Sequence, residues 1–467
     1  MDRRARALVV LVVAVVVALA GTLSYLLLFP ATSPSTSGGP SGTAYCPASS
    51  ESVGNWTTYH GDNARSGDVP TASVTSARAT WTGPVALDGQ VYAQPLVCGN
   101  AVFVATEDDS VYAINATNGS ILWRTHLGTP VPGSTLPCGD ISPSGITSTP
   151  VIDPATGVLY VVAFEMPAPE HVLYGLSVAN GSIRSQVVID PAGVSPTVEQ
   201  QRGALALANG YVYVPFGGLF GDCGQYHGYV EGAPVGATGP VLSYQVPTQR
   251  EGAIWGTGGM AVAPNGTLYV ATGNGASNSA FDFGDSVIEL SPTLTEVDYF
   301  APTNWVALNE NDQDLGSVAP TLLPNGVLFQ IGKAGVGYVL DPSHLGGIGG
   351  QLGEQSVCAG AYGGTAHVGS SILVPCTNGL FDLAVGATNF TETWQSANFD
   401  AGSPIVTGNV VWVVNISTAD LLGLSLASGA LLFAFPLGSV DHFVSATATP
   451  DRVLVAGGSE LYSFSLS

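Results

Sequence analysis

Positive charge is scarce in this sequence. Only 11 of the 467 residues are Lys or Arg, whereas 34 are Asp or Glu, which gives a formal net charge of −23. Three of these bases, Arg3, Arg4 and Arg6, stand before an apolar run near the N-terminus. Because few cations remain to contact phosphates, we do not expect nucleic acid to be a partner.

Several catalytic motifs are also missing. The sequence contains no H-E-x-x-H, no G-x-S-x-G and no phosphate-binding loop with a lysine. This argues against the zinc proteases, the hydrolases with a nucleophile elbow and the P-loop nucleotide hydrolases. The seven histidines are scattered, and we interpret His60 and His227 as structural residues.

Glycine and proline, in contrast, are abundant, with 60 and 31 residues. The stretch from Ala93 to Gly128 indicates that such residues form turns, because turn residues there separate four short runs of β-forming residues. These runs are 95–98, 102–105, 110–114 and 121–125. The pattern predicts one four-stranded antiparallel sheet, which needs neighbouring copies to bury both of its apolar faces.

Similar units follow at intervals of roughly 40 to 60 residues, the spacing of propeller blades. Their first strands start near Pro95, Pro150, Ala204, Met260, Pro320, Ala366, Pro404 and Ala446. The last unit has only three strands, and the segments 79–81 and 84–87 would supply its fourth strand and close the ring. We therefore predict an all-β fold, an eight-bladed β-propeller over residues 54–467.

The N-terminal region predicts a membrane anchor. Residues 7–29 carry no charge, and as a helix they would cover about 34 Å, enough to span a bilayer of about 30 Å. The arginines before them predict a cytoplasmic stub at 1–6 and a single-pass protein with its propeller outside the cell membrane. A cleaved signal peptide is the alternative, since Ala18-Leu19-Ala20 has the small-x-small form. Residues 30–53 have the Ser, Thr, Pro and Gly content of a flexible stalk.

An extracytoplasmic location allows disulfides, and the six cysteines are an even number. Cys98 and Cys138 flank one blade, and Cys358 and Cys376 are close in sequence. Cys46 and Cys223 would then be left over. The sequence does not choose among the pairings.

A known family is suggested by the segment 55–67, which contains the pattern W-x-x-Y-x-G-D-x-x-R-S from Trp56 to Ser66. An A-x-W strand and then the A-x-P-L-V blade motif follow. With these motifs the chain resembles the quinoprotein alcohol dehydrogenases, eight-bladed propellers that hold pyrroloquinoline quinone (PQQ) and a calcium or lanthanide ion on the central axis. The blade motif alone also occurs in non-catalytic propellers such as the outer-membrane assembly lipoprotein, so it indicates fold and not function.

The resemblance assigns roles to individual residues. Trp255 takes the position of the indole on which the quinone stacks, and Asn274 takes that of a metal ligand. Asp312 takes the position of the general base, which also binds the metal, with Asp314 as the alternate. Lys333, the only lysine of the chain, stands where a cation polarises the quinone carbonyl. Each residue also has a structural interpretation, such as a tryptophan packed between blades or a solvated acidic turn.

The match to this family is incomplete. Its adjacent cysteine pair, which covers the quinone, is replaced by the single Cys138, and Asn311 replaces a tryptophan before Asp312. The family's metal-binding glutamate falls near Asp222, which becomes the third predicted metal ligand. No C-x-x-C-H sequence is present, so we expect no haem, and electrons would have to pass to a separate acceptor.

Two functions therefore stay open. The first is a membrane-anchored oxidoreductase that binds PQQ and Ca²⁺ and oxidises a small alcohol or sugar. The second is a non-catalytic envelope propeller that acts as a scaffold for a protein or glycan partner.

Overall fold

The computed structural model describes residue 46 and residues 54–467, which belong to one compact unit. The predicted cytoplasmic stub, the membrane helix at 7–29 and, apart from Cys46, the stalk lie outside the described residues. Within the part of the chain that is described, no helix is both long and apolar enough to cross a membrane.

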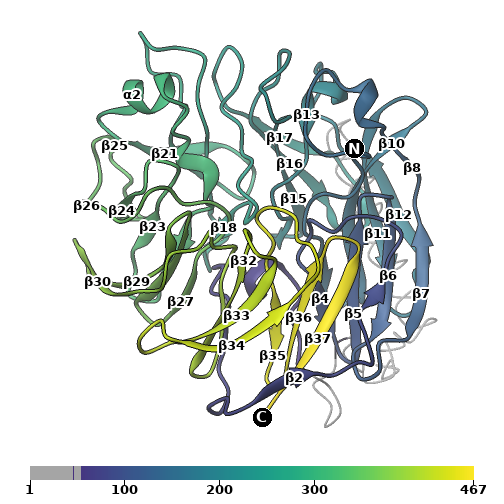
Figure 1. The fold of residues 1–467 in the computed structure, drawn as a ribbon. Coiled ribbons are helices and arrows are strands. Elements are labelled where there is room, and N and C mark those ends of the chain that lie inside the picture. Colours follow the sequence, from purple (N-terminus) through teal and green to yellow (C-terminus); the bar gives the residue numbers. More distant parts are fainter. Residues whose placement is uncertain (1–45, 47–53) are drawn as a thin grey trace, which may run out of the picture. The chain divides into compact units, whose positions relative to one another are not determined.

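The described residues form eight β-sheets, which we call blades 1 to 8 in chain order of their central strands (Figure 1). Blade 1 consists of β4 (Leu96–Cys98), β5 (Ala101–Thr106), β6 (Ser110–Asn115) and β7 (Ile121–His126), and blade 2 consists of β8 (Thr129–Pro130), β9 (Val151–Asp153), β10 (Val158–Met166), β11 (Glu170–Ser177) and β12 (Ile183–Val188). Blade 3 consists of β13 (Glu199–Gln200), β14 (Ala206–Ala208), β15 (Tyr211–Gly218), β16 (Tyr229–Pro234) and β17 (Leu242–Gln245), and blade 4 consists of β18 (Ala261–Val262), β19 (Leu268–Ala271), β20 (Val287–Leu290), β21 (Glu296–Ala301) and β25 (Gly347–Ile348).

Blades 5 to 8 complete the ring. Blade 5 consists of β22 (Thr321–Leu322), β23 (Leu328–Gln330), β24 (Val336–Leu340) and β26 (Gly353–Ser356), and blade 6 consists of β27 (Ala366–Val368), β28 (Ser371–Cys376), β29 (Gly379–Val385) and β30 (Phe390–Gln395). Blade 7 consists of β1 (Asp68–Val69), β31 (Ile405–Thr407), β32 (Val410–Asn415), β33 (Asp420–Ser425) and β34 (Leu431–Pro436), and blade 8 consists of β2 (Ala77–Ala79), β3 (Val85–Ala86), β35 (Thr447–Thr449), β36 (Arg452–Gly457) and β37 (Glu460–Leu466). One α-helix, α2 (Trp305–Glu310), stands in the connection from blade 4 to blade 5 among the described residues.

The predicted eight-bladed propeller is confirmed, including the way in which the ring closes. The four predicted runs of the first repeat are strands β4 to β7, and Val102 pairs antiparallel with Ile114. Strands β2 and β3, from the N-terminal side of the repeats, both pair antiparallel with β37 at the end of the chain. Blade 8 is thus built from both ends of the propeller segment. This pairing within one sheet closes the ring.

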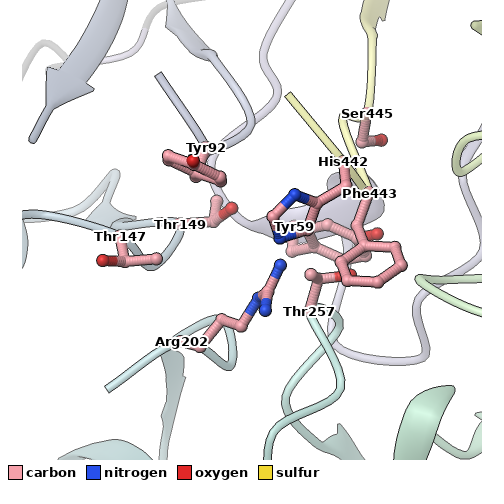
Figure 2. A pocket seen from close by; sticks show the side chains of 9 residues that line it. All are labelled: Tyr59, Tyr92, Thr147, Thr149, Arg202, Thr257, His442, Phe443 and Ser445. Carbon is pink, nitrogen blue, oxygen red and sulfur yellow. The ribbon is translucent and has the colours of Figure 1, made fainter. Parts of the chain in front are cut away.

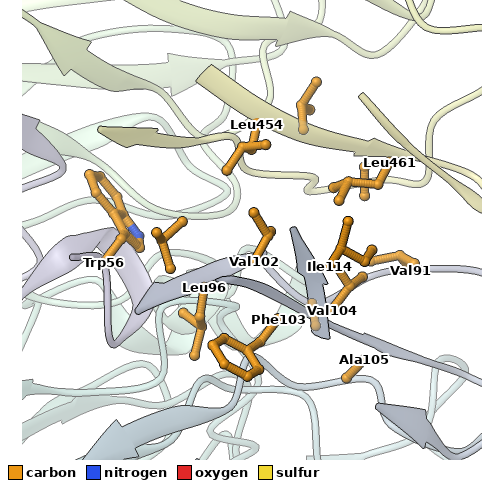
Figure 3. Close-up of a cluster of buried hydrophobic side chains, with 14 of the residues drawn as sticks. Trp56, Val91, Leu96, Val102, Phe103, Val104, Ala105, Ile114, Leu454 and Leu461 are labelled. Atoms are coloured by element: carbon orange, nitrogen blue, oxygen red, sulfur yellow. The ribbon is translucent and has the colours of Figure 1, made fainter. Parts of the chain in front are cut away.

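Apolar side chains between the blades form the core. Figure 3 shows the contact between blades 8 and 1, where Leu454 and Leu461 face the sheet that carries Val102 and Ile114. All four side chains are fully buried. Each buried aliphatic side chain of this kind stabilises the fold by about 1.5–3 kcal/mol. The runs of β-forming residues that predicted the strands therefore also supply the surfaces by which the blades stack.

The family motif at 56–66 has a structural use that its sequence did not reveal. This hub segment lies against the inner strands of several blades: Trp56 exchanges backbone hydrogen bonds with Val97 of blade 1, and Asn63 accepts one from Val262 of blade 4. His60, fully buried, uses both ring nitrogens on Thr365 and Ser445, and burial lowers its pKa to about 3. The structural role that we predicted for His60 is confirmed.

Candidate functional site

A cavity of about 570 Å³ lies above the hub segment, and all five predicted site residues line it. Its walls come from loops that follow second strands of the blades and from connections between blades. Asn274 follows β19 and Lys333 follows β23, whereas the turns between first and second strands lie at the other end of these strands. The propeller thus gathers residues that are far apart in sequence at one end of its axis.

Lys333 is the centre of the polar wall of this cavity. Its Nζ lies 2.7 Å from Asp312 Oδ1 and 2.7 Å from Asp314 Oδ2. Asn274 donates from Nδ2 to Asp312 Oδ1 at 3.1 Å and from its backbone N–H to Asp314 Oδ1 at 2.8 Å. The three predicted residues therefore form one connected cluster, and Asp314, named only as an alternate, completes it.

The two aspartates differ sharply in environment. The side chain of Asp312 is 72% exposed, whereas that of Asp314 is 9% exposed. Burial raises the pKa of Asp314, and the charge of Lys333 opposes this rise. Burial alone would lower the pKa of Lys333, but the charges and hydrogen bonds of Asp314 and Asp312 raise it above its ordinary value. The ammonium is consequently charged at any pH near neutrality.

Close backbone packing holds this cluster in place. A Cβ atom on Gly332 would overlap the backbone of Asp314 and Leu315, and one on Gly273 would lie 2.8 Å from Asp314 Oδ1. The backbone N–H of Lys333 donates to the carbonyl oxygen of Asp314 at 3.0 Å. Glycines at these two positions therefore let three loops approach closely enough for the ion pairs to form.

Aromatic side chains form the other walls. Nζ of Lys333 lies 5.5 Å from the centroid of the Trp255 ring, a cation–π distance. The ring of Phe443 is tilted by 51° to Trp255 at a centroid distance of 6.1 Å, and Tyr362 stacks on Phe443 at 5.5 Å. The cavity thus combines flat apolar surfaces with the polar cluster of Lys333, Asp312 and Asp314.

Asp222 lies in the loop between β15 and β16, which forms a separate wall of the cavity. Its Oδ1 accepts a hydrogen bond from the hydroxyl of Tyr226. A disulfide between Cys138 and Cys223 ties this loop to the connection between blades 1 and 2. The chain therefore has a disulfide next to the cavity although it lacks the adjacent cysteine pair.

All six cysteines are paired, and the pairs are Cys46–Cys98, Cys138–Cys223 and Cys358–Cys376. Of the neighbours in sequence, Cys358 and Cys376 are joined. Cys98 and Cys138, which flank one blade, are not joined to each other. The sequence had left these pairings open.

Known proteins share this arrangement of blades. The family described as outer membrane protein assembly factor BamB matches residues 56–217. A quinohemoprotein alcohol dehydrogenase from Pseudomonas putida HK5 has a TM-score of 0.68 over 89% of this chain and 80% of its own, at 14% identity. The chain therefore shares the β-propeller fold of these proteins. A europium-containing methanol dehydrogenase has the same TM-score of 0.68 over 89% of this propeller and 98% of its own chain, at 15% identity.

BamB from Moraxella catarrhalis is a further structural neighbour of this chain, with a TM-score of 0.55 over 84% of this chain and 98% of its own, at 13% identity. No curated protein sequence matches the chain. At these identities the likeness concerns the fold, and the activity has to be argued from the cavity itself.

A divalent cation does not fit the predicted ligands as they are arranged in this propeller. Among the described residues, no group of three His, Cys, Asp or Glu side chains is placed to hold a metal ion. Asp312 Oδ1 already accepts hydrogen bonds from Asn274 and Lys333, and Asp222 is bonded to Tyr226 on another wall. The cation between the two carboxylates is the Lys333 ammonium.

The sequence motifs did not point to several cavity residues, among them Arg202 and Phe443. Arg202 lies between β13 and β14 of blade 3, and Phe443 lies in the connection to blade 8. Neither residue belongs to a motif whose spacing fixes its place. The scarcity of cations was the one signal that could have drawn attention to Arg202.

Proposed function

We propose that this cavity is the active site of a PQQ-dependent dehydrogenase that oxidises a small alcohol or sugar. The observation that carries the proposal is the convergence of Trp255, Asn274, Asp312 and Lys333 in one cavity. These residues come from separate loops, and their side chains are joined by ion pairs and hydrogen bonds. A flat acceptor of electrons beside a fixed cation and a carboxylate is the arrangement that hydride removal needs.

The residues present suit a planar, anionic quinone. Trp255 and Phe443 offer aromatic faces, and Lys333 offers positive charge to the carboxylates that PQQ carries. The Oδ1 atom of Asn274 is buried and accepts no hydrogen bond from the described residues, so a ligand donor would satisfy it. When bound, PQQ supplies a carbonyl that accepts hydride.

Asp312 is the better candidate for the general base. Both carboxylate oxygens of Asp314 are engaged, one by the Asn274 N–H and the other by Lys333. Asp312 uses only Oδ1 for its contacts with Lys333 and Asn274, and its side chain is 72% exposed in the cavity wall. Its other oxygen can therefore take the proton of an alcohol, while Lys333 holds the carboxylate in place.

Binding of the quinone tests this proposal directly. The full chain mixed with PQQ should retain the quinone absorbance through gel filtration. Lys333→Ala removes the fixed cation and should weaken retention at least tenfold. The matched control is Arg184→Ala, because Arg184 is exposed on β12 and does not line the cavity. This variant should bind quinone as the wild type does. A wild-type chain that retains no quinone would refute the proposal.

We further propose that the propeller is anchored through residues 7–29 and lies outside the membrane, with 30–53 as its stalk. Three disulfides among the described residues suit an oxidising compartment. Cys46 is joined to Cys98 beside the turn between β4 and β5, at the end of the ring opposite the cavity. An extracytoplasmic propeller leaves the cavity accessible to small substrates from outside the cell. Protease protection in sealed vesicles measures the orientation.

A scaffold function is the second candidate, and the likeness to BamB supports it. At the cavity rim the Phe220 side chain is 69% exposed, an apolar group that a partner protein would cover. The test applies if the chain fails to bind quinone. If the wild type then captures an envelope protein and the Phe220→Ser variant does not, the scaffold function is favoured.

A further inference from the structure

A second, much smaller chamber lies between the hub segment and the large cavity. Its volume is about 10 Å³, close to the space that one water molecule needs. Its lining consists of hydroxyl, aromatic and basic side chains and is shown in Figure 2: Tyr59, Tyr92, Thr147, Thr149, Arg202, Thr257, His442, Phe443 and Ser445. Arg202, His442 and Phe443 also line the large cavity, so they separate the two spaces.

Arg202 is the unusual member of this lining. It is 9% exposed, and its guanidinium points into the middle of the chamber (Figure 2). Its Nε and Nη2 atoms are buried and have no hydrogen-bond partner among the described residues. The centroid of the Phe443 ring lies 4.6 Å from the guanidinium carbon. Burial of a cation without a counter-ion costs several kcal/mol, so we expect a further group of negative charge in the chamber.

Two nearby carboxylates do not fill this role. Asp140 and Glu107 favour the charged form of Arg202, but neither lies within ion-pair distance of it, and the closest basic partner of Asp140 is His442, at 3.7 Å. Burial together with the charge of Arg202 lowers the pKa of His442 to about 4, so this imidazole is neutral near pH 7. Arg202 is therefore the charged base of the chamber lining, and it has no paired counter-ion among the described residues.

The hydroxyl groups around Arg202 can also donate. The oxygen of Thr149 accepts the backbone N–H of Gln94 at 2.9 Å, which leaves its hydroxyl proton free. Thr257 Oγ1 and the Tyr59 hydroxyl are buried without a hydrogen-bond partner among the described residues. Donors from several blades thus surround one small space.

We propose that this chamber binds a small monovalent anion, chloride under ordinary conditions. A water molecule would fit the volume but would leave the charge of Arg202 uncompensated, whereas carboxylate and phosphate ions need more room than the chamber has. A chloride ion is larger than a water molecule, so the side chains of the lining would move apart slightly to admit it, and it accepts hydrogen bonds from every side. It would neutralise Arg202 and hold the guanidinium against Phe443 at the base of the large cavity. This inference does not depend on the proposed dehydrogenase function.

Thermal unfolding of the full chain in sodium chloride and in sodium gluconate of equal ionic strength tests the site. A saturable stabilisation is expected in chloride, with a rise in Tm of about 3 °C at a hundredfold excess over Kd for a chain of this size. Arg202→Gln should abolish the difference between the two salts. Arg184→Gln, the exposed control, should keep it. Equal Tm values for the wild type in both salts would overturn the proposal.

Bromide locates the ion without any substitution, so the proposal remains testable if Arg202→Gln does not fold. Crystals of the wild type soaked in bromide should show an anomalous peak enclosed by Arg202, Thr257 and Tyr59. A peak elsewhere only, or stabilisation by acetate and not by bromide, would show that Arg202 serves an organic carboxylate from the large cavity, and would overturn the proposal.

Discussion

The ammonium of Lys333 lies 2.7 Å from Asp314 Oδ2, and this carboxylate is the more buried of its two partners, with a side-chain exposure of 9%. The ion pair joins the loop after β23 to the connection between blades 4 and 5. It therefore contributes to the fold as well as to the cavity.

The two aspartates should differ in their effect on stability. Asp314→Asn removes the buried partner of Lys333, and breaking such a pair costs about 3–5 kcal/mol. Asp312→Asn changes an exposed partner and should cost less than about 1 kcal/mol. Denaturant unfolding of both variants measures the difference. Equal losses would show that the burial of Asp314 does not decide the strength of the pair.

Quinone binding should not require a divalent metal. The Lys333 ammonium already lies 2.7 Å from Asp312 Oδ1, on the carboxylate that the family resemblance assigned to calcium. We expect EDTA treatment to leave the PQQ absorbance retained after gel filtration unchanged. Release of bound quinone by EDTA, with recovery on adding Ca²⁺, would contradict this expectation. Absence of any binding without EDTA would instead count against the dehydrogenase function.

Gly332 should not tolerate a side chain. A Cβ there would overlap the backbone that carries Asp314, so Gly332→Ala should cost about 1–3 kcal/mol and weaken quinone binding. Gly83→Ala is the matched control, because nothing lies within 4 Å of its Cβ position. The control should change the free energy of unfolding by less than about 0.5 kcal/mol. Denaturant unfolding compares the two variants.

Stability should fall as the pH rises. Burial raises the pKa of Asp109 to about 9, of Glu199 to about 8, and of Glu107 and Glu231 to about 7. The folded state then binds more protons than the unfolded chain, in which Asp and Glu titrate near pH 4. The contribution of these groups to stability is thus greatest below about pH 4 and is lost progressively up to about pH 9, with a slope of up to about 1.4 kcal/mol per pH unit for each group.

Asp109→Asn tests this dependence on a single group. Its carboxylate is fully buried, and neither oxygen has a hydrogen-bond partner among the described residues. The variant should gain stability relative to the wild type at pH 8 and show a flatter pH profile in urea unfolding. Glu392→Gln, on the exposed side of β30, should keep the wild-type slope. A wild type most stable at pH 8 would refute the prediction.

The sequence by itself determined the propeller. Runs of apolar residues with a period of two, separated by turns and repeated along the chain, predict strands β4 to β7 and their copies. The incomplete last unit likewise predicted that β2 and β3 would pair with β37. Asn274 and Lys333 each follow the second strand of a blade, and these strands end on the same side of the ring. Their positions relative to the strands could therefore be predicted.

Only the tertiary structure decided what fills the space between these motifs. The connections between blades vary in length, so the sequence could not tell that Asp314 is buried and Asp312 exposed, or that Cys138 meets Cys223. It also could not show that Arg202 lacks a counter-ion and lies under Phe443. Burial and partnership depend on which loops meet once the ring has closed, and local pattern carries no information about that.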